Sequence, residues 1–132
     1  MKKLILIFAI LFSLSASTQQ FTTLLNGNYT SNTSGTALAI ASDNAWSIQV
    51  IWSGATGTVN GVIYFEVSND GTNWIAYASN SYIAISGASG TGGYDPGNIN
   101  MSWRFIRARY VKGTTTKVTL NVYFNQLIKK TN

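Results

Sequence analysis

The chain has 132 residues, which fits one domain, and its composition of 45% hydrophobic, 13% aromatic and 10% charged residues is too apolar for a disordered chain. The net charge of +5 comes without a dense basic stripe, so no nucleic-acid partner is expected. The chain has no Cys and no His, which excludes disulfides and thiolate metal sites and removes the commonest general base.

The first segment, residues 1–19, has the pattern of an export signal. It begins with Lys2 and Lys3, continues with an apolar run over 4–14 and ends with small residues at 15–17. The run is shorter than the roughly 20 apolar residues that a membrane span needs. We therefore expect a signal peptide at 1–19, with a retained membrane anchor as the alternative, followed by a β-sandwich domain over 20–132.

After Gln20 the apolar residues recur with the period of two that is typical of β-strands. The pattern predicts eight strands, at 21–25, 35–41, 45–52, 61–67, 73–78, 82–86, 102–111 and 117–125. No segment has a convincing amphipathic helical pattern. Short strands joined by Gly-rich turns predict an all-β fold, a single antiparallel jelly-roll sandwich.

Three of these strands alternate clearly enough to predict which side chains fill the core. The apolar faces are Trp46, Ile48, Val50 and Trp52; Ile63, Phe65 and Val67; and Val118, Leu120, Val122 and Phe124. The Thr- and Asn-rich faces opposite them are expected to meet water.

The stretch SNDGTNW, residues 68–74, predicts a tight β-turn between two strands. Asn69 or Asp70 can bond the backbone of the turn, and Gly71 readily adopts a positive φ. Trp74 is expected on the returning strand, packed into the core.

Calcium binding is an alternative use of this loop. Ca²⁺ takes six to eight oxygen ligands, and Asn69, Asp70, Asp43 and Asp95 could supply several of them if their loops converge. The turn is the simpler interpretation, so we expect no metal and no cofactor.

Residues 87–100, GASGTGGYDPGNIN, are rich in Gly and contain the only Pro of the chain. We expect a long irregular loop here, and such loops often contact a ligand, although a plain connection between sheets is the alternative. Tyr94, Asp95 and Asn98 are the candidate binding residues, with Tyr94 as an exposed ring for stacking on a sugar. Further candidate rings are Tyr64, Tyr77, Tyr82 and Tyr110, although most of these are expected to be sheet or core residues.

The strand 102–111 carries the other candidate binding residues. Alternation places Arg107 and Arg109 on one face with Trp103. Arg beside an aromatic ring can stack on a sugar or base, or bind a carboxylate or phosphate at two points. The alternative is that each Arg lies along apolar surface and pairs with Glu66 or Asp95.

Two segments carry a family resemblance. YFEVSNDGTNWIAY resembles the strand-to-turn segment of discoidin-like, galactose-binding-like domains, and WRFIRARYV resembles a later strand of that family. The likeness covers about residues 45–111. It implies an eight-stranded jelly roll that binds glycans, lipids or protein surfaces through loops at one end. The family's long N-terminal region and terminal Cys pair are missing here. Small modules with this turn also resemble domains of bacteriophage structural proteins.

No enzyme is expected, because the four carboxylates show no spacing of a glycosidase pair and no phosphate-binding loop is present. Size, composition and resemblance favour a structural or attachment protein, foremost a bacteriophage virion component such as a capsid, spike or decoration protein. The alternative is a secreted bacterial module that binds glycans or surfaces. Expected partners are other copies or other structural proteins, with a cell-surface glycan or a membrane reached through residues 1–19 as alternatives.

Overall fold

The computed structural model describes residues 18–41, 45–97 and 101–128. Residues 1–17 of the expected signal or anchor, together with Asp43 and Asn98, lie outside the described residues. In the described ranges no helix has the length and apolarity that crossing a membrane requires.

Within these described ranges, ten strands form two antiparallel sheets. They are β1 (Thr18–Tyr29), β2 (Thr33–Ser34), β3 (Leu38–Ala39), β4 (Trp46–Gly57), β5 (Val62–Ser68), β6 (Ile75–Ala76), β7 (Tyr82–Ala84), β8 (Gly90–Tyr94), β9 (Phe105–Val111) and β10 (Thr115–Ile128). Sheet A has the order β1-β10-β4-β8. Sheet B has the order β2-β9-β5-β6, and in addition β3 pairs with β9 and β7 pairs with β5.

The strand order is that of a jelly roll, which confirms the predicted fold. When β2 with β3 and β6 with β7 are each counted as one interrupted strand, the ten strands become eight. Numbered in chain order, sheet A is then 1-8-3-6 and sheet B is 2-7-4-5. Each sheet takes strands from both halves of the chain, as two interleaved Greek keys do.

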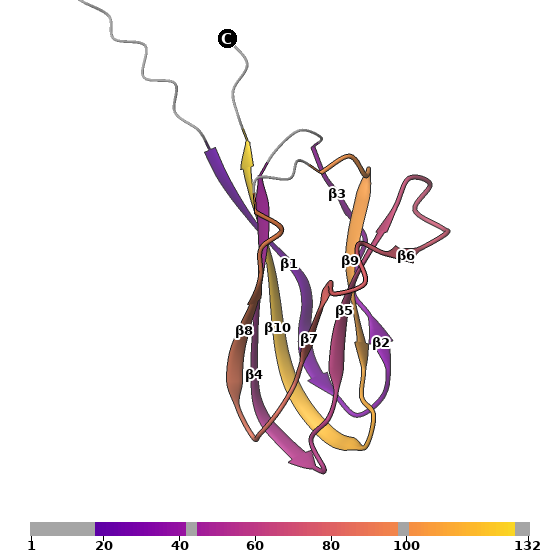
Figure 1. Cartoon of the computed structure of the whole chain (residues 1–132). Coiled ribbons are helices and arrows are strands. Elements are labelled where there is room, and N and C mark those ends of the chain that lie inside the picture. The colour runs from indigo at the N-terminus through magenta and orange to yellow at the C-terminus, as the bar shows by residue number, and fades with distance from the viewer. Residues whose placement is uncertain (1–17, 42–44, 98–100, 129–132) are drawn as a thin grey trace, which may run out of the picture.

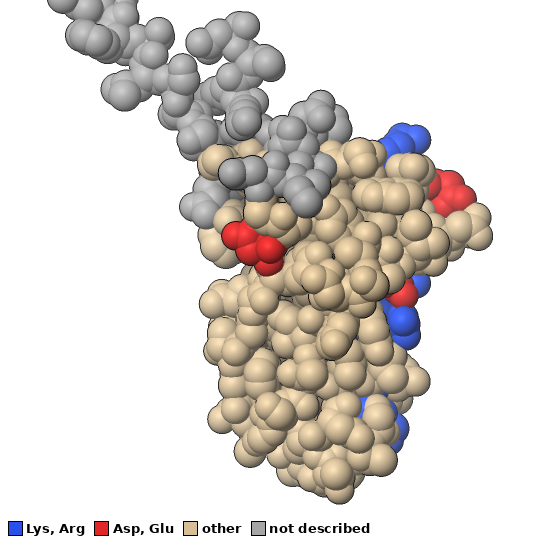
Figure 2. Space-filling view, viewed as in Figure 1, with Lys and Arg blue, Asp and Glu red and all other residues tan. Residues whose placement is uncertain are grey.

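Figure 1 shows the two sheets facing each other. The start of β1, the end of β10 and the projecting turn between β5 and β6 lie at one end of the sandwich, which we call the loop end. In the same view, the visible Lys and Arg side chains lie along the right-hand side, the side of sheet B (Figure 2).

The core consists of the side chains between the sheets, and the predicted inward faces are confirmed. All eleven predicted core residues on β4, β5 and β10 are at most 7% exposed. Ile106, Ala108 and Tyr110 of β9 join them with no exposed surface. Each large apolar side chain buried in this way stabilises the fold by about 1.5–3 kcal/mol.

The expectation of an irregular loop at 87–100 is wrong for its middle part, where β8 pairs with β4 and forms the edge of sheet A opposite β1. Positions 90 and 92 of β8 require glycine, because neighbouring side chains occupy the space that a Cβ would need. A Cβ on Gly92 would lie 2.8 Å from Cγ2 of Ile83, and one on Gly90 would overlap the ring of Trp52. These glycines serve close packing in a strand, so their number is a poor sign of a loop.

Candidate functional site

The turn at 68–74 is closed by its own side chains. Ser68 Oγ accepts a hydrogen bond from the backbone N–H of Gly71 at 2.9 Å, and Gly71 has a φ of 73°. Asp70 Oδ1 accepts from the backbone N–H groups of Thr72 and Asn73, each at 2.8 Å, and Asp70 Oδ2 accepts from Asn73 Nδ2 at 2.7 Å. These hydrogen bonds within the turn therefore define its shape.

These donors hold the pKa of the Asp70 carboxyl far below its ordinary value, and the backbone N–H of Asn73 contributes most. Such a carboxylate stays ionised and stabilises the turn by accepting these hydrogen bonds. Asp95 makes a separate local contact, because its Oδ1 accepts from the backbone N–H of Gly97 at 2.8 Å. Over residues 18–41, 45–97 and 101–128 there is no group of three or more His, Cys, Asp or Glu side chains that could hold a metal ion.

Trp74 is not a core residue, so the expectation of an inward-packed ring is wrong. It precedes β6 and is half-buried. The reason is the register between β5 and β6, in which Glu66 lies opposite Ala76 and Val67 opposite Ile75. Alternation then places Trp74 with Ala76 on the outer face. There the guanidinium carbon of Arg107 lies 4.3 Å from the centroid of the Trp74 ring.

Arg107 and Arg109 both pair with Glu66, at the centre of the outer face of sheet B. Glu66 Oε2 accepts a hydrogen bond from Nε of Arg107 at 2.8 Å and forms an ion pair with Arg107 Nη2 at 2.7 Å. Glu66 Oε1 accepts a hydrogen bond from Nε of Arg109 at 2.5 Å. Glu66 is only 7% exposed, so the two guanidiniums offset the cost of burying its charge. We call Glu66, Arg107 and Arg109 the Arg–Glu cluster.

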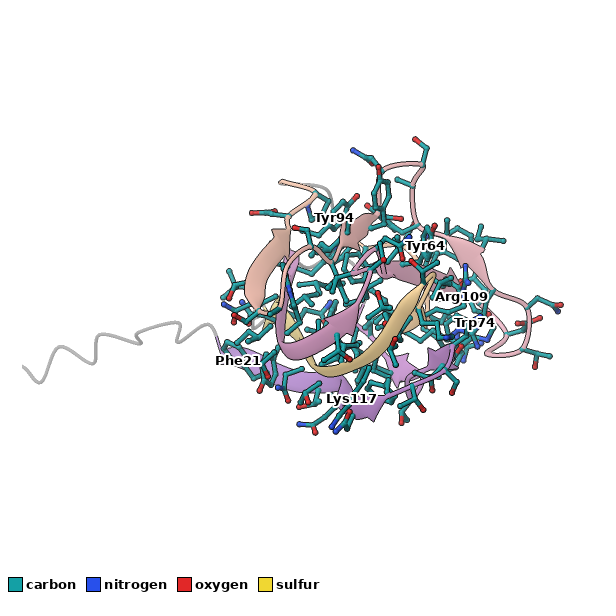
Figure 3. All side chains as sticks on the ribbon, turned by 90° about the horizontal axis from the view of Figure 1, so that it is seen from below. Phe21, Tyr64, Trp74, Tyr94, Arg109 and Lys117 are labelled. Carbon is teal, nitrogen blue, oxygen red and sulfur yellow. The ribbon has the colours of Figure 1, made fainter. Side chains whose placement is uncertain are left out.

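An aromatic row crosses the sheet beside this cluster. Register places Arg109 of β9, Tyr64 of β5 and Tyr82 of β7 side by side on three neighbouring strands. The Arg109 guanidinium carbon lies 4.9 Å from the Tyr64 ring centroid, and the two Tyr rings are 6.0 Å apart. Tyr82 is 47% exposed. Figure 3 shows Tyr64, Arg109 and Trp74 on one side of the sandwich, away from Phe21 and Lys117.

Tyr94 does not stand on an exposed loop, which corrects the expectation for it. It ends β8 opposite Ile48, a core residue, so its ring turns inward. The ring packs 5.8 Å from Trp46, 5.6 Å from Phe65 and 6.3 Å from Tyr77, centroid to centroid. Burial raises the pKa of the Tyr94 hydroxyl.

The remaining candidates lie apart from one another. Asp95 borders a hollow of about 380 Å³ at the loop end, together with Tyr77 and Asn80. Trp103 is half-buried against the core and lines a second hollow of about 260 Å³, beside Asn69 and the exposed Ile75.

The structure thus brings together Arg107 and Arg109 but separates them from Tyr94, Asp95 and Trp103. Tyr82 and Glu66 complete the arrangement on sheet B. The alternation of residues 62–68 places Glu66 on the face opposite Phe65 and Val67. Tyr82 could be placed on the same face only once the pairing of β5 with β7 was known.

No family model matches the chain, and no curated protein matches it in sequence. The solved structures with a similar fold include the following two. One comes from work titled "Bacillus endospore appendages form a novel family of disulfide-linked pili"; it is 14% identical with a TM-score of 0.46, over 87% of this chain and 92% of that one. The other is an infectious bursal disease virus structure, strain Gx, 13% identical with a TM-score of 0.44 over 89% of this chain. This chain covers 31% of that viral chain. These similarities are loose, so the function must be argued from the residues of this chain.

Proposed function

We propose that this protein is a non-catalytic structural subunit that works in an assembly of many copies. The assembly that we propose is a bacteriophage virion, with the chain as a capsid, spike or decoration component. The observation that carries the proposal is the chemistry of the outer face and the edge of sheet A.

The outer face of sheet A is nearly free of charge. Lys117 is the one charged residue on its four strands, within the described ranges. The outward side chains are mainly Asn, Gln, Ser and Thr, with Ile51 37% exposed and Phe21 65% exposed. Soluble monomers normally carry mixed charges on such a surface, whereas the centres of protein interfaces are depleted of charge. This face is therefore suited to contact another protein.

Strand β1 adds a free edge to that face. It is twelve residues long and has no Pro and no charged residue, and within the described part of the chain it pairs only with β10. Natural edge strands are usually short, charged or interrupted, because an open edge recruits strands from other chains. A β-bulge between Thr23 and Leu25 interrupts the edge partway along. The stretch before the bulge can pair with a neighbouring copy or another structural protein.

The proposal of a non-catalytic role rests on the polar groups that the chain has. It contains no His or Cys. The carboxylates of Glu66 and Asp70 accept hydrogen bonds from protein donors on both oxygens. A positioned acid–base pair needs groups that can reach a substrate.

The test is a charge placed at the centre of the face. We expect the wild-type full chain to associate with rising concentration in sedimentation velocity and the Ile51→Lys variant to stay monomeric. Tyr82→Lys, which adds the same charge on sheet B, should associate like wild type. Both variants keep residues 1–17, so association driven by that segment would persist in Ile51→Lys. That outcome, or a wild-type chain that stays monomeric, would contradict the proposal.

A further inference from the structure

We propose that the outer face of sheet B binds a sugar chain bearing carboxylates, through Arg109 and Tyr82. The inference rests on the proposed function and deepens it. If the outer face of sheet A contacts other subunits, the outer face of sheet B remains available for attachment. It is built from side chains that the fold already holds in place.

Arg109 presents an open, fixed guanidinium. Its Nε is bonded to Glu66, and its side chain is 38% exposed. Among the described residues, its two terminal nitrogens have no hydrogen-bond partner. The Tyr64 ring beneath it fixes the plane of the group. A guanidinium held in this way can bind a carboxylate at two points with little loss of side-chain freedom.

The charges of the Arg–Glu cluster favour an anionic ligand. Two guanidiniums face one carboxylate, which leaves one positive charge in excess. Arg107 contacts Glu66 through both Nε and Nη2, and its guanidinium is stacked on Trp74. Few of its hydrogen-bond donors are therefore available to a ligand. The carboxylate of Glu66 is almost wholly covered. A ligand that approaches the face therefore meets the open end of Arg109.

The aromatic row favours a sugar over other anions. Arg109, Tyr64 and Tyr82 span three neighbouring strands, or about 10 Å across a flat face. Tyr82, the most exposed ring of the row, offers a surface on which the apolar face of a pyranose can stack. A nucleic acid would need several open cations along its path. A free phosphate would make no use of Tyr82.

The probe is a polygalacturonate oligomer, with its methyl ester as the neutral counterpart of the same ring and linkage. We expect the acidic oligomer to bind the full chain and the ester to bind at least about tenfold more weakly, as the loss of one charge-assisted pair implies. Arg109→Gln should lose a similar factor, and Tyr82→Ala should weaken the acidic oligomer severalfold. Lys117→Gln removes the same charge from sheet A and should bind like wild type.

Four results would overturn the inference. Two concern the probe: the acidic oligomer does not bind, or the ester binds as tightly as the acidic oligomer. In the other two, Lys117→Gln loses as much affinity as Arg109→Gln, or polyglutamate, which has carboxylates without sugar rings, binds as tightly as the acidic oligomer. Arg109→Lys keeps the charge and removes the two-point geometry, so it should also bind more weakly. Melting midpoints show whether each variant is folded. The association experiment changes sheet A, so either proposal can fail without the other.

Discussion

At the scale of single residues, the stretch from Ser68 to Trp74 shows which roles are local. Asp70 and Gly71 shape the turn through bonds and dihedrals within a few residues, so residue type alone indicates their part. The position of Trp74 depends on how β5 and β6 pair. A shift of one residue would turn its ring to the other face, and the sequence carries no signal for that register.

Because Trp74 lies on the outer face, its removal should cost little. We expect Trp74→Ala to lower the free energy of unfolding by about 1–2 kcal/mol, from partial burial and the lost stacking with Arg107. Phe65→Ala, which empties a core site, should cost about 3–5 kcal/mol. Urea unfolding of both variants measures the difference. An equal loss would mean that Trp74 is a core residue after all.

At the scale of elements, the alternation of apolar and polar residues predicts a strand only where its inward positions hold large apolar side chains. The faces of β4, β5 and β10 could be predicted because Val50, Phe65 and Leu120 each stand in a regular apolar row. Strand β8 has no such row, since its inward positions include Gly90 and Gly92. The cause lies in Trp52 and Ile83, which are distant in sequence, so the strand could not be recognised from residues 87–100 alone.

This explanation of β8 can be tested with two matched substitutions. Gly90→Ala should lower the free energy of unfolding by about 1–3 kcal/mol, because its methyl group would overlap the Trp52 ring. Gly93→Ala should have little effect, since the nearest atom to its Cβ is the carbonyl oxygen of Ile48 at 3.7 Å. Thermal or urea unfolding reports both. Equal tolerance of the two changes would show that β8 does not pack as described.

At the scale of the whole molecule, the two outer faces differ in chemistry. Sheet A is almost uncharged and ends in the open edge of β1, while sheet B carries the Arg–Glu cluster and its aromatic row. Composition indicates that charges are few, but only the topology places the Arg-rich β9 beside Glu66 on β5. We therefore propose that the outer face of sheet A serves assembly and that the outer face of sheet B contacts the ligand.

We propose that the chain works as many copies in a particle. The most direct measurement is a density gradient of an extract from the natural source, with the chain quantified in each fraction by mass spectrometry. We expect the chain to band with particles of one buoyant density, in many copies per particle, until the particles are dissociated. Recovery of the chain as a monomer in the soluble fraction, with none in the particle band, would contradict the account.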